Sequence, residues 1–168
     1  EGPPHTMNPD DDITHRGTVY PWHCDQVGHV NVMHYAARFD EATWNLFAQI
    51  GLTPSYFRAS RRGMAAVDQH IEYRRELLAG DVITIRSRVL EIHARKIRFR
   101  HELRAIDSGD SSEPISAVCT LLGVHVDTAA RQACPFPADV IARAGSRIQP
   151  QQPGPGSGPP ATTTSRPR

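Results

Sequence analysis

The segment Tyr20-Pro-Trp-His-Cys-Asp-Gln-Val-Gly-His-Val-Asn-Val-Met-His-Tyr35 joins a polar loop to the start of a helix. Asp25, His29 and Asn31 lie within seven consecutive residues, around Gly28. Apolar residues then recur at the spacing of a helix with one buried face, namely Val32, Tyr35, Phe39, Ala42, Leu46 and Ile50. The segment therefore predicts a carboxylate, an imidazole and an amide at the N-terminus of a buried helix.

Such a loop can take part in a chemical reaction because of where it lies. The backbone N–H groups of a first helical turn have no partners within the helix, and the helix dipole favours negative charge there. A carboxylate and an imidazole beside these donors can polarise a carbonyl and attack it, or direct a water molecule at it. The structural alternative is that Asp25 and Asn31 only shape a turn, which is common for both residue types.

Length and composition indicate one globular domain. A chain of 168 residues is long enough for a single hydrophobic core and short for two domains. Nine of its 14 prolines and four of its 12 glycines lie in the two end segments 1–12 and 148–168. We therefore expect a disordered segment over 1–12, a folded domain over 13–147 and a disordered Pro/Gly-rich tail over 148–168.

Charge and hydropathy exclude several classes of partner. The formal net charge of +1 argues against general nucleic-acid binding, which uses a strongly basic surface. No apolar run approaches the roughly 20 residues of a membrane span, and no signal-peptide pattern is present. The three cysteines are an odd number without framework spacing, which is typical of a reducing compartment. These features predict a cytoplasmic protein without a membrane or nucleic-acid partner.

The remaining pattern predicts one long helix packed on a mainly antiparallel sheet, an α+β fold. Strands are expected at 13–20, 64–76, 82–92, 96–105 and 115–127, the long helix at 31–50, and short helical segments at 53–57 and 138–144. The alternation is clearest in the fourth strand, where His101 falls on the apolar face and is expected to be a hydrogen-bonded core histidine. Because a sheet of this kind has edges, we expect at least a dimer.

Two motifs resemble one known family. The segment 24–31, followed by Tyr35 and Asp40-Glu41, resembles the active-site loop and central helix of hotdog-fold acyl-CoA thioesterases of the 4-hydroxybenzoyl-CoA thioesterase type. The segments His70-Ile-Glu-Tyr-Arg-Arg-Glu-Leu77 and Gly80-Asp81 resemble that family's next strand and turn, and His29-Val-Asn31 with residues 72–76 is also similar to the plant acyl-ACP thioesterases. The likeness covers roughly residues 18–127.

The resemblance implies a fold and an activity. The fold would be the hotdog fold, in which an antiparallel sheet wraps around one long central helix, assembled as a homodimer or homotetramer. The activity would be hydrolysis of an acyl-CoA thioester to the free acid and CoA. No cofactor is expected, since coenzyme A enters only as part of the substrate.

The resemblance also assigns roles to individual residues. Asp25 matches the catalytic carboxylate of the acyl-CoA enzymes, a nucleophile or a general base. His29 and Glu76 match the histidine and glutamate of the acyl-ACP branch, although that branch has an asparagine in place of Val27 and a cysteine in place of Leu77. For Glu76 the alternative is a surface charge paired with a neighbouring arginine.

Substrate contacts are expected in two places. Backbone amides at Asn31 and Val32 would polarise the thioester carbonyl, and Tyr35 of the same motif is assigned to substrate binding. Guanidinium groups match phosphate oxygens, so basic residues at probable turns are predicted to hold the phosphates of coenzyme A; these are Arg61, Arg62, Arg95 and Lys96. For each, an ordinary charged surface is the alternative.

Other functions remain open at this stage. The loop carries metal-capable side chains, but their spacing matches no common zinc motif; they are His23, Cys24, Asp25, His29 and His34. Cys24 beside His29 can also serve as a nucleophile, whereas a lone cysteine is more often inert packing. A non-catalytic acyl-CoA or acyl-carrier binding module would use the same fold. A hydratase is disfavoured because His29 follows Asp25 by four residues and not five. Trp22 and Trp44 can wall an aromatic pocket or fill the core.

Overall fold

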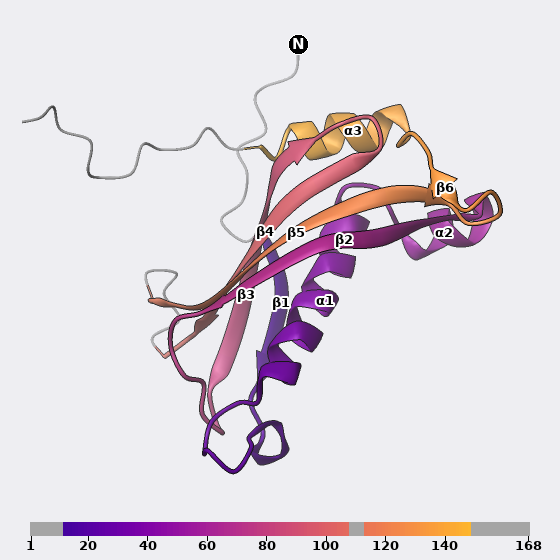
Figure 1. Ribbon diagram of the computed structural model, residues 1–168. Coiled ribbons are helices and arrows are strands. Elements are labelled where there is room, and N and C mark those ends of the chain that lie inside the picture. The colour runs from indigo at the N-terminus through magenta and orange to yellow at the C-terminus, as the bar shows by residue number, and fades with distance from the viewer. Residues whose placement is uncertain (1–11, 108–112, 149–168) are drawn as a thin grey trace, which may run out of the picture.

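A long helix is enclosed by a curved antiparallel sheet in the computed structural model, which describes residues 12–107 and 113–148 (Figure 1). The elements are β1 (Ile13–Thr18), the short 3-10 helix η1 (Pro21–His23), α1 (Val32–Gln49), α2 (Pro54–Ser60), β2 (Arg62–Tyr73), β3 (Val82–Ile92), β4 (Lys96–Ala105), β5 (Ile115–Asp127), β6 (Gln132–Ala133) and α3 (Ala138–Gly145). The predicted disordered ends lie almost wholly outside the described residues.

The strands follow the order β1-β3-β4-β5-β2, and every neighbouring pair is antiparallel. The two-residue strand β6, which the sequence did not predict, pairs with the end of β5. β2 is paired on one side only, so it forms an edge of the described sheet. The α+β fold with an antiparallel sheet around one long helix is confirmed.

Helix α1 begins and ends where the sequence predicts. Asn31 caps its N-terminus, because the Asn31 side-chain oxygen accepts a hydrogen bond from the Met33 N–H at 3.1 Å. Gly51 ends it with a φ of +100°, a left-handed conformation that glycine adopts without strain. Leu52 then donates back to the Phe47 carbonyl at 2.9 Å.

The predicted buried face of α1 holds except at its first residue. The side chains of Tyr35, Phe39, Ala42, Leu46 and Ile50 are buried in the core. Val32 is instead 59% exposed. Periodicity alone placed Val32 on the buried face, but it lies in the first turn, where the described chain offers no packing partner.

His101 lies fully buried in a hydrogen-bonded chain of polar side chains. The Thr43 hydroxyl donates to the Phe39 carbonyl at 2.8 Å, which leaves its oxygen to accept from His101 Nε2 at 2.9 Å. His101 Nδ1 then accepts from the Ser87 hydroxyl at 2.5 Å, and Thr14 extends the chain to Ser87. Burial lowers the pKa of His101 to about 3, so the ring is neutral. The prediction of a hydrogen-bonded core histidine is confirmed.

Several boundaries differ from those predicted. Helix α2 extends to Ser60, beyond the predicted segment 53–57, and Thr53 caps it as Pro54 begins it. β2 ends at Tyr73, so Glu76 lies in the loop that follows. The fold also includes Asp12, whose carbonyl accepts a hydrogen bond from the Ser87 N–H at 2.8 Å. No helix of the described chain is both long and apolar enough to cross a membrane.

Candidate active site

The loop before α1 is a tight turn built on Asp25 and Gly28. The Gly28 N–H donates to the Asp25 carbonyl at 3.0 Å, and the Asp25 N–H donates to the His29 carbonyl at 3.2 Å. Gly28 has a φ of +95°, which a residue with a side chain rarely adopts. The turn folds the carboxylate of Asp25 back toward the start of α1.

Both oxygens of the Asp25 carboxylate accept hydrogen bonds. Oδ1 accepts from the Val27 N–H at 2.9 Å, and Oδ2 accepts from the Asn31 side-chain amide at 2.9 Å. These donors, Val27 first and then Asn31, stabilise the charged form and lower the pKa of Asp25 below its ordinary value. The carboxylate is therefore ionised at neutral pH and held in one orientation.

The backbone amides at the start of α1 are not all available to a substrate. The Asn31 N–H donates to the His23 carbonyl at 2.9 Å, and the Met33 N–H is taken by the Asn31 side chain. The Val32 N–H takes part in none of the hydrogen bonds of the described chain. Of the two amides predicted to polarise a carbonyl, Val32 is thus the free donor, and Asn31 instead orients Asp25.

His29 and Glu76 approach each other beside this turn. His29 Nε2 lies 3.9 Å from Glu76 Oε1, although the Glu76 side chain is 73% exposed. The loops that carry them are joined, because the Val30 N–H donates to the Leu77 carbonyl at 2.9 Å. Of the two arginines that precede Glu76, Arg74 and Arg75, the first pairs with Glu72 at 2.8 Å.

Tyr35 lies below the surface. Its side chain is 4% exposed and packs edge to face on Tyr73 at the end of β2, with ring centroids 5.1 Å apart. Burial raises the pKa of Tyr35. In the single chain, Tyr35 therefore supports the wall between α1 and β2 and does not present its ring at the surface.

The four basic residues predicted to hold phosphates lie at the other end of α1. Arg61 and Arg62 lie where α2 meets β2, Arg95 lies in the β3–β4 turn, and Lys96 begins β4. The 18 residues of α1 separate this end from the Asp25 loop by about 27 Å (Figure 1). Arg62 forms an ion pair with Asp127. One chain by itself therefore does not bring these residues to Asp25.

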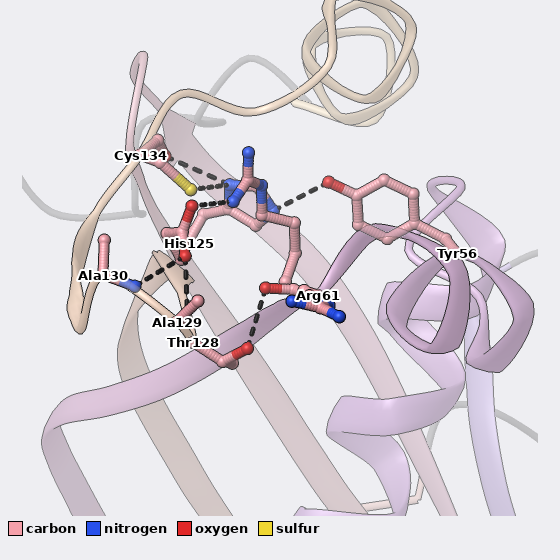
Figure 2. Close-up of polar contacts among 9 residues, drawn as sticks. Tyr56, Arg61, His125, Thr128, Ala129, Ala130 and Cys134 are labelled. Carbon is pink, nitrogen blue, oxygen red and sulfur yellow. Dashed lines mark hydrogen bonds and ion pairs between the residues drawn. The ribbon is translucent and has the colours of Figure 1, made fainter.

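That end also contains a histidine cluster which sequence reasoning missed (Figure 2). His125 Nδ1 lies 3.1 Å from the Cys134 carbonyl and 3.3 Å from its sulfur, and Nε2 lies 2.9 Å from the Tyr56 hydroxyl. Nδ1–H donates to the carbonyl, so Nε2 accepts from the Tyr56 hydroxyl. Both ring nitrogens of His125 therefore have hydrogen-bond partners while the ring is neutral. Burial lowers the pKa of His125. These contacts tie α2 to the residue that follows β6. Because the ring is neutral and its Nδ1 is a donor, the cluster is unsuited to activating the Cys134 thiol.

Two cavities lie along α1 and β2. The first, of about 310 Å³, is lined by Ala36, Asp40, Thr43, Trp44, Phe47, Met64, Ala65, Ala66, Gln69, Phe99, Leu121 and Gly123. The second, of about 520 Å³, shares Trp44 and Met64 with the first and continues toward α2. Neither is lined by Asp25, His29 or Glu76. Trp44 lines both cavities, which is one of the two roles predicted for it. Trp22 instead stacks on Tyr20 at the surface.

The chain belongs to the thioesterase-like superfamily, whose family model matches residues 19–144. Its fold is that of a Staphylococcus aureus protein solved in complex with CoA, with a TM-score of 0.75 and 16% identity over 85% of this chain and 89% of that one. The family and the hotdog fold predicted from the sequence are therefore confirmed. At this identity the structural likeness shows the fold alone.

Two curated relatives carry more specific names. The chain is 30% identical over 131 residues to the L-carnitine dehydrogenase/betainyl-CoA thioesterase of Agrobacterium fabrum, covering 78% of this chain and 26% of that protein. It is 26% identical over 130 residues to the betainyl-CoA thioesterase of Pseudomonas aeruginosa, covering 77% of this chain and 79% of that protein. The chain thus spans about a quarter of the first relative and about four fifths of the second.

Proposed function

We propose that this chain hydrolyses an acyl-CoA thioester to a free acid and CoA, with Asp25 as nucleophile or general base. The observation that supports this most directly is an ionised carboxylate, oriented by two hydrogen bonds, beside the unpaired Val32 amide at a helix N-terminus. The amide would stabilise the oxygen of the carbonyl as it gains negative charge, while Asp25 attacks the carbon or takes a proton from water.

His29 and Glu76 have a supporting role in this proposal. They lie 3.9 Å apart at the rim of the Asp25 turn, where an imidazole and a carboxylate can hold a water molecule between them. Thiolate is a good leaving group, so the reaction needs a polarised carbonyl and a positioned attacking group and no cofactor. The dehydrogenase activity in the name of the Agrobacterium relative forms no part of the proposal, since that protein extends far beyond the matched region.

We further propose that two copies of the chain complete the site by pairing their β2 edges. β2 has an open side and carries the exposed apolar residues Val67 and Tyr73. Identical edges related by a twofold axis pair antiparallel, which sets the Arg61 end of one β2 against the Tyr73 end of the other. The Asp25 loop lies beside Tyr73, so Arg61 and Arg62 of a second copy would reach the phosphates of a CoA bound there. A tetramer would be a pair of such dimers.

The proposal is tested by measuring thiol release from a panel of short, long, aromatic and charged acyl-CoAs. Asp25→Asn should lower kcat by at least about a hundredfold, since a positioned base or nucleophile contributes that much. The matched control is Asp139→Asn, which removes a carboxylate from the surface of α3 and should keep the rate of the natural chain. Full activity in Asp25→Asn would overturn the assignment. Tight binding of acyl-CoA without turnover by the natural chain would identify a binding module instead.

A further inference from the structure

We propose that the aromatic pair formed by Tyr20 and Trp22 binds the adenine base of coenzyme A. This inference rests on the proposed hydrolysis of an acyl-CoA thioester, and it names the residues that recognise the nucleotide of that substrate. Three observations support it: the exposure of the Trp22 indole, the contacts that hold the pair in place, and its position on the loop that carries Asp25.

The Trp22 side chain presents a large flat ring to solvent. It is 70% exposed, the highest fraction among the exposed large hydrophobic side chains of the described residues. Its ring stacks on that of Tyr20, with centroids 4.5 Å apart and planes inclined by 6°. Because Tyr20 covers one face of the indole, the opposite face is open and can stack on a second flat ring.

The pair is fixed by the short helix η1, which begins at Pro21. The Tyr20 N–H donates to His23 Nδ1 at 2.9 Å, and the His23 N–H donates to the Tyr20 carbonyl at 2.9 Å. The Cys24 N–H donates to the Pro21 carbonyl at 3.1 Å. These hydrogen bonds hold the stack of Tyr20 and Trp22 ready for a ligand, so binding orders few groups and costs little conformational entropy.

The pair is also joined to the start of α1. The His23 ring stands edge to face on His34 of α1, with centroids 4.8 Å apart. The His23 carbonyl accepts a hydrogen bond from the Asn31 N–H at 2.9 Å, and the Asn31 side chain in turn donates to Asp25. The aromatic pair is therefore held against the helix N-terminus at which the proposed reaction takes place.

The pair lies on the side of α1 that faces β1. His34 precedes Arg38 by one helical turn, so both lie on one face of the helix. Arg38 donates to the Thr18 carbonyl of β1 at 3.0 Å, which places that face beside β1. β1 and β2 stand at opposite ends of the strand order. A second copy paired through β2 would thus leave the Trp22 ring accessible.

The chemistry of coenzyme A suits this position. Its adenine is a flat heteroaromatic ring, and stacking of such a base on an aromatic side chain stabilises binding. Trp22 precedes Asp25 by three residues, so their Cα atoms are at most about 11 Å apart. The flexible pantetheine arm can bend back over this distance. The nucleotide would then cross the tip of the Asp25 loop, with adenine on the β1 side and its phosphates toward Arg61 and Arg62 of a second copy.

The fluorescence of Trp22 gives a test that does not depend on turnover. The chain contains two tryptophans, so Trp44→Phe leaves Trp22 as the single indole. Adenosine 3′,5′-bisphosphate, which is part of CoA, should quench this fluorescence when it is excited at a wavelength that adenine does not absorb. Pantetheine 4′-phosphate, which has no base, should leave it unchanged. Absence of quenching by the bisphosphate, at concentrations well above the KM for acyl-CoA, would overturn the assignment.

Kinetics of Trp22 variants give a second test. Trp22→Ala should raise the KM for acyl-CoA by about tenfold, the size of one lost base stack, and keep kcat within about twofold. The KM for the same acyl group carried on N-acetylcysteamine, which lacks the nucleotide, should not change. Trp22→Phe keeps a stacking ring and should restore most of the affinity. Leu78→Ala removes another exposed apolar side chain, from the β2–β3 loop, and should leave both KM values unchanged.

The outcomes separate this inference from the enzymatic proposal. If no acyl-CoA is hydrolysed but CoA and the bisphosphate both quench Trp22, the adenine assignment holds and the enzymatic proposal fails. If Trp22→Ala raises the KM for both esters equally, Trp22 only shapes the Asp25 loop and the adenine assignment is wrong. It is also wrong if the bisphosphate quenches without competing with acyl-CoA, or if Trp22→Ala changes the oligomeric mass, because a separate nucleotide or a second copy then occupies the pair.

Discussion

Two polar networks in this chain have opposite consequences. The network around His101 runs through Thr14, Ser87 and Thr43, lies in the core, and gives each ring nitrogen a partner. The network around Asp25 lies at the surface and leaves the Val32 amide unpaired. Both cost conformational freedom to assemble. Only the second retains hydrogen-bonding capacity that a substrate can use.

The difference teaches where to look for chemistry in the fold. A complete buried network stabilises a neutral histidine and makes its protonation costly, so it contributes to folding. An incomplete network at a helix N-terminus keeps a charge and a free donor close together, so it contributes to binding and reaction. Changes to the first network should therefore alter stability, and changes to the second should alter turnover.

Acidification should give the largest effect, which is a loss of folding stability through the buried network around His101. The pKa of His101 is about 3 in the folded chain against 6.5 when unfolded. Between these values the unfolded chain binds a proton that the folded chain does not, so stability is complete above pH 6.5 and falls as the pH drops toward 3. The free energy of unfolding should fall by roughly 1 kcal/mol per pH unit from this group. Urea unfolding at several pH values measures the slope.

His101→Gln sharpens this test, because an amide can keep hydrogen bonds to Thr43 and Ser87 but does not titrate. The variant should be less stable at neutral pH and show a shallower loss in acid. His15 and His125, whose pKa values are also lowered by burial, would supply the slope that remains. An unchanged slope in His101→Gln would mean that His101 is not the group that acid attacks.

A second change tests the incomplete network. Asn31→Ser keeps a residue able to cap α1 but removes the amide that donates to Asp25, so stability should change by well under 1 kcal/mol. The kcat/KM for the best acyl-CoA should fall by up to about a hundredfold, because the carboxylate loses its fixed orientation. Since the Asn31 amide lowers the pKa of Asp25, the acid limb of the pH–rate profile should also move to higher pH.

The profile separates positioning from folding. A variant that was only misfolded would lose amplitude at every pH without moving the limb. Asn31→Ala, which removes the cap as well, should show the same shift together with a loss of about 1 kcal/mol in the free energy of unfolding. An Asn31→Ser protein with an unchanged profile would contradict the role assigned to Asn31.

Much of the fold follows from local pattern. The alternation in 96–105 predicted β4 with its apolar face inward, and Gly51 predicted the end of α1, because both signals depend on neighbouring residues alone. The exposure of Val32 did not follow, since periodicity identifies a face but not where the covering sheet stops. β6 was missed because two residues are too few to show a period, and their strand character depends on pairing with β5.

The candidate site, too, could be predicted from local sequence only in part. One short motif, residues 25–32, contains Asp25, Asn31 and Val32. Their closeness in the chain predicts that they come together, and they do so in the structure. The partners of His125 come from α2 and from beyond β5, so no local signal marks His125 within an apolar strand. The shared helical face of Asp40 and Trp44 is readable from their spacing. That β2 forms the opposite wall of a cavity depends on the topology of the sheet.

The smallest effect is expected for the His125 cluster, which lies at the end of the molecule opposite to the Asp25 loop. Tyr56→Phe removes the hydroxyl that donates to Nε2 of the buried His125. The unsatisfied nitrogen should lower the free energy of unfolding by about 1–2 kcal/mol, measured by thermal or urea unfolding. Because this cluster is complete without a ligand, kcat/KM should stay within about twofold. Cys134→Ser, which keeps the backbone carbonyl that accepts from His125, is the milder control. A large loss of activity at unchanged stability would show that the α2 end contributes to the reacting site, as it would if the neighbouring Arg61 and Arg62 contact the CoA held by a second copy.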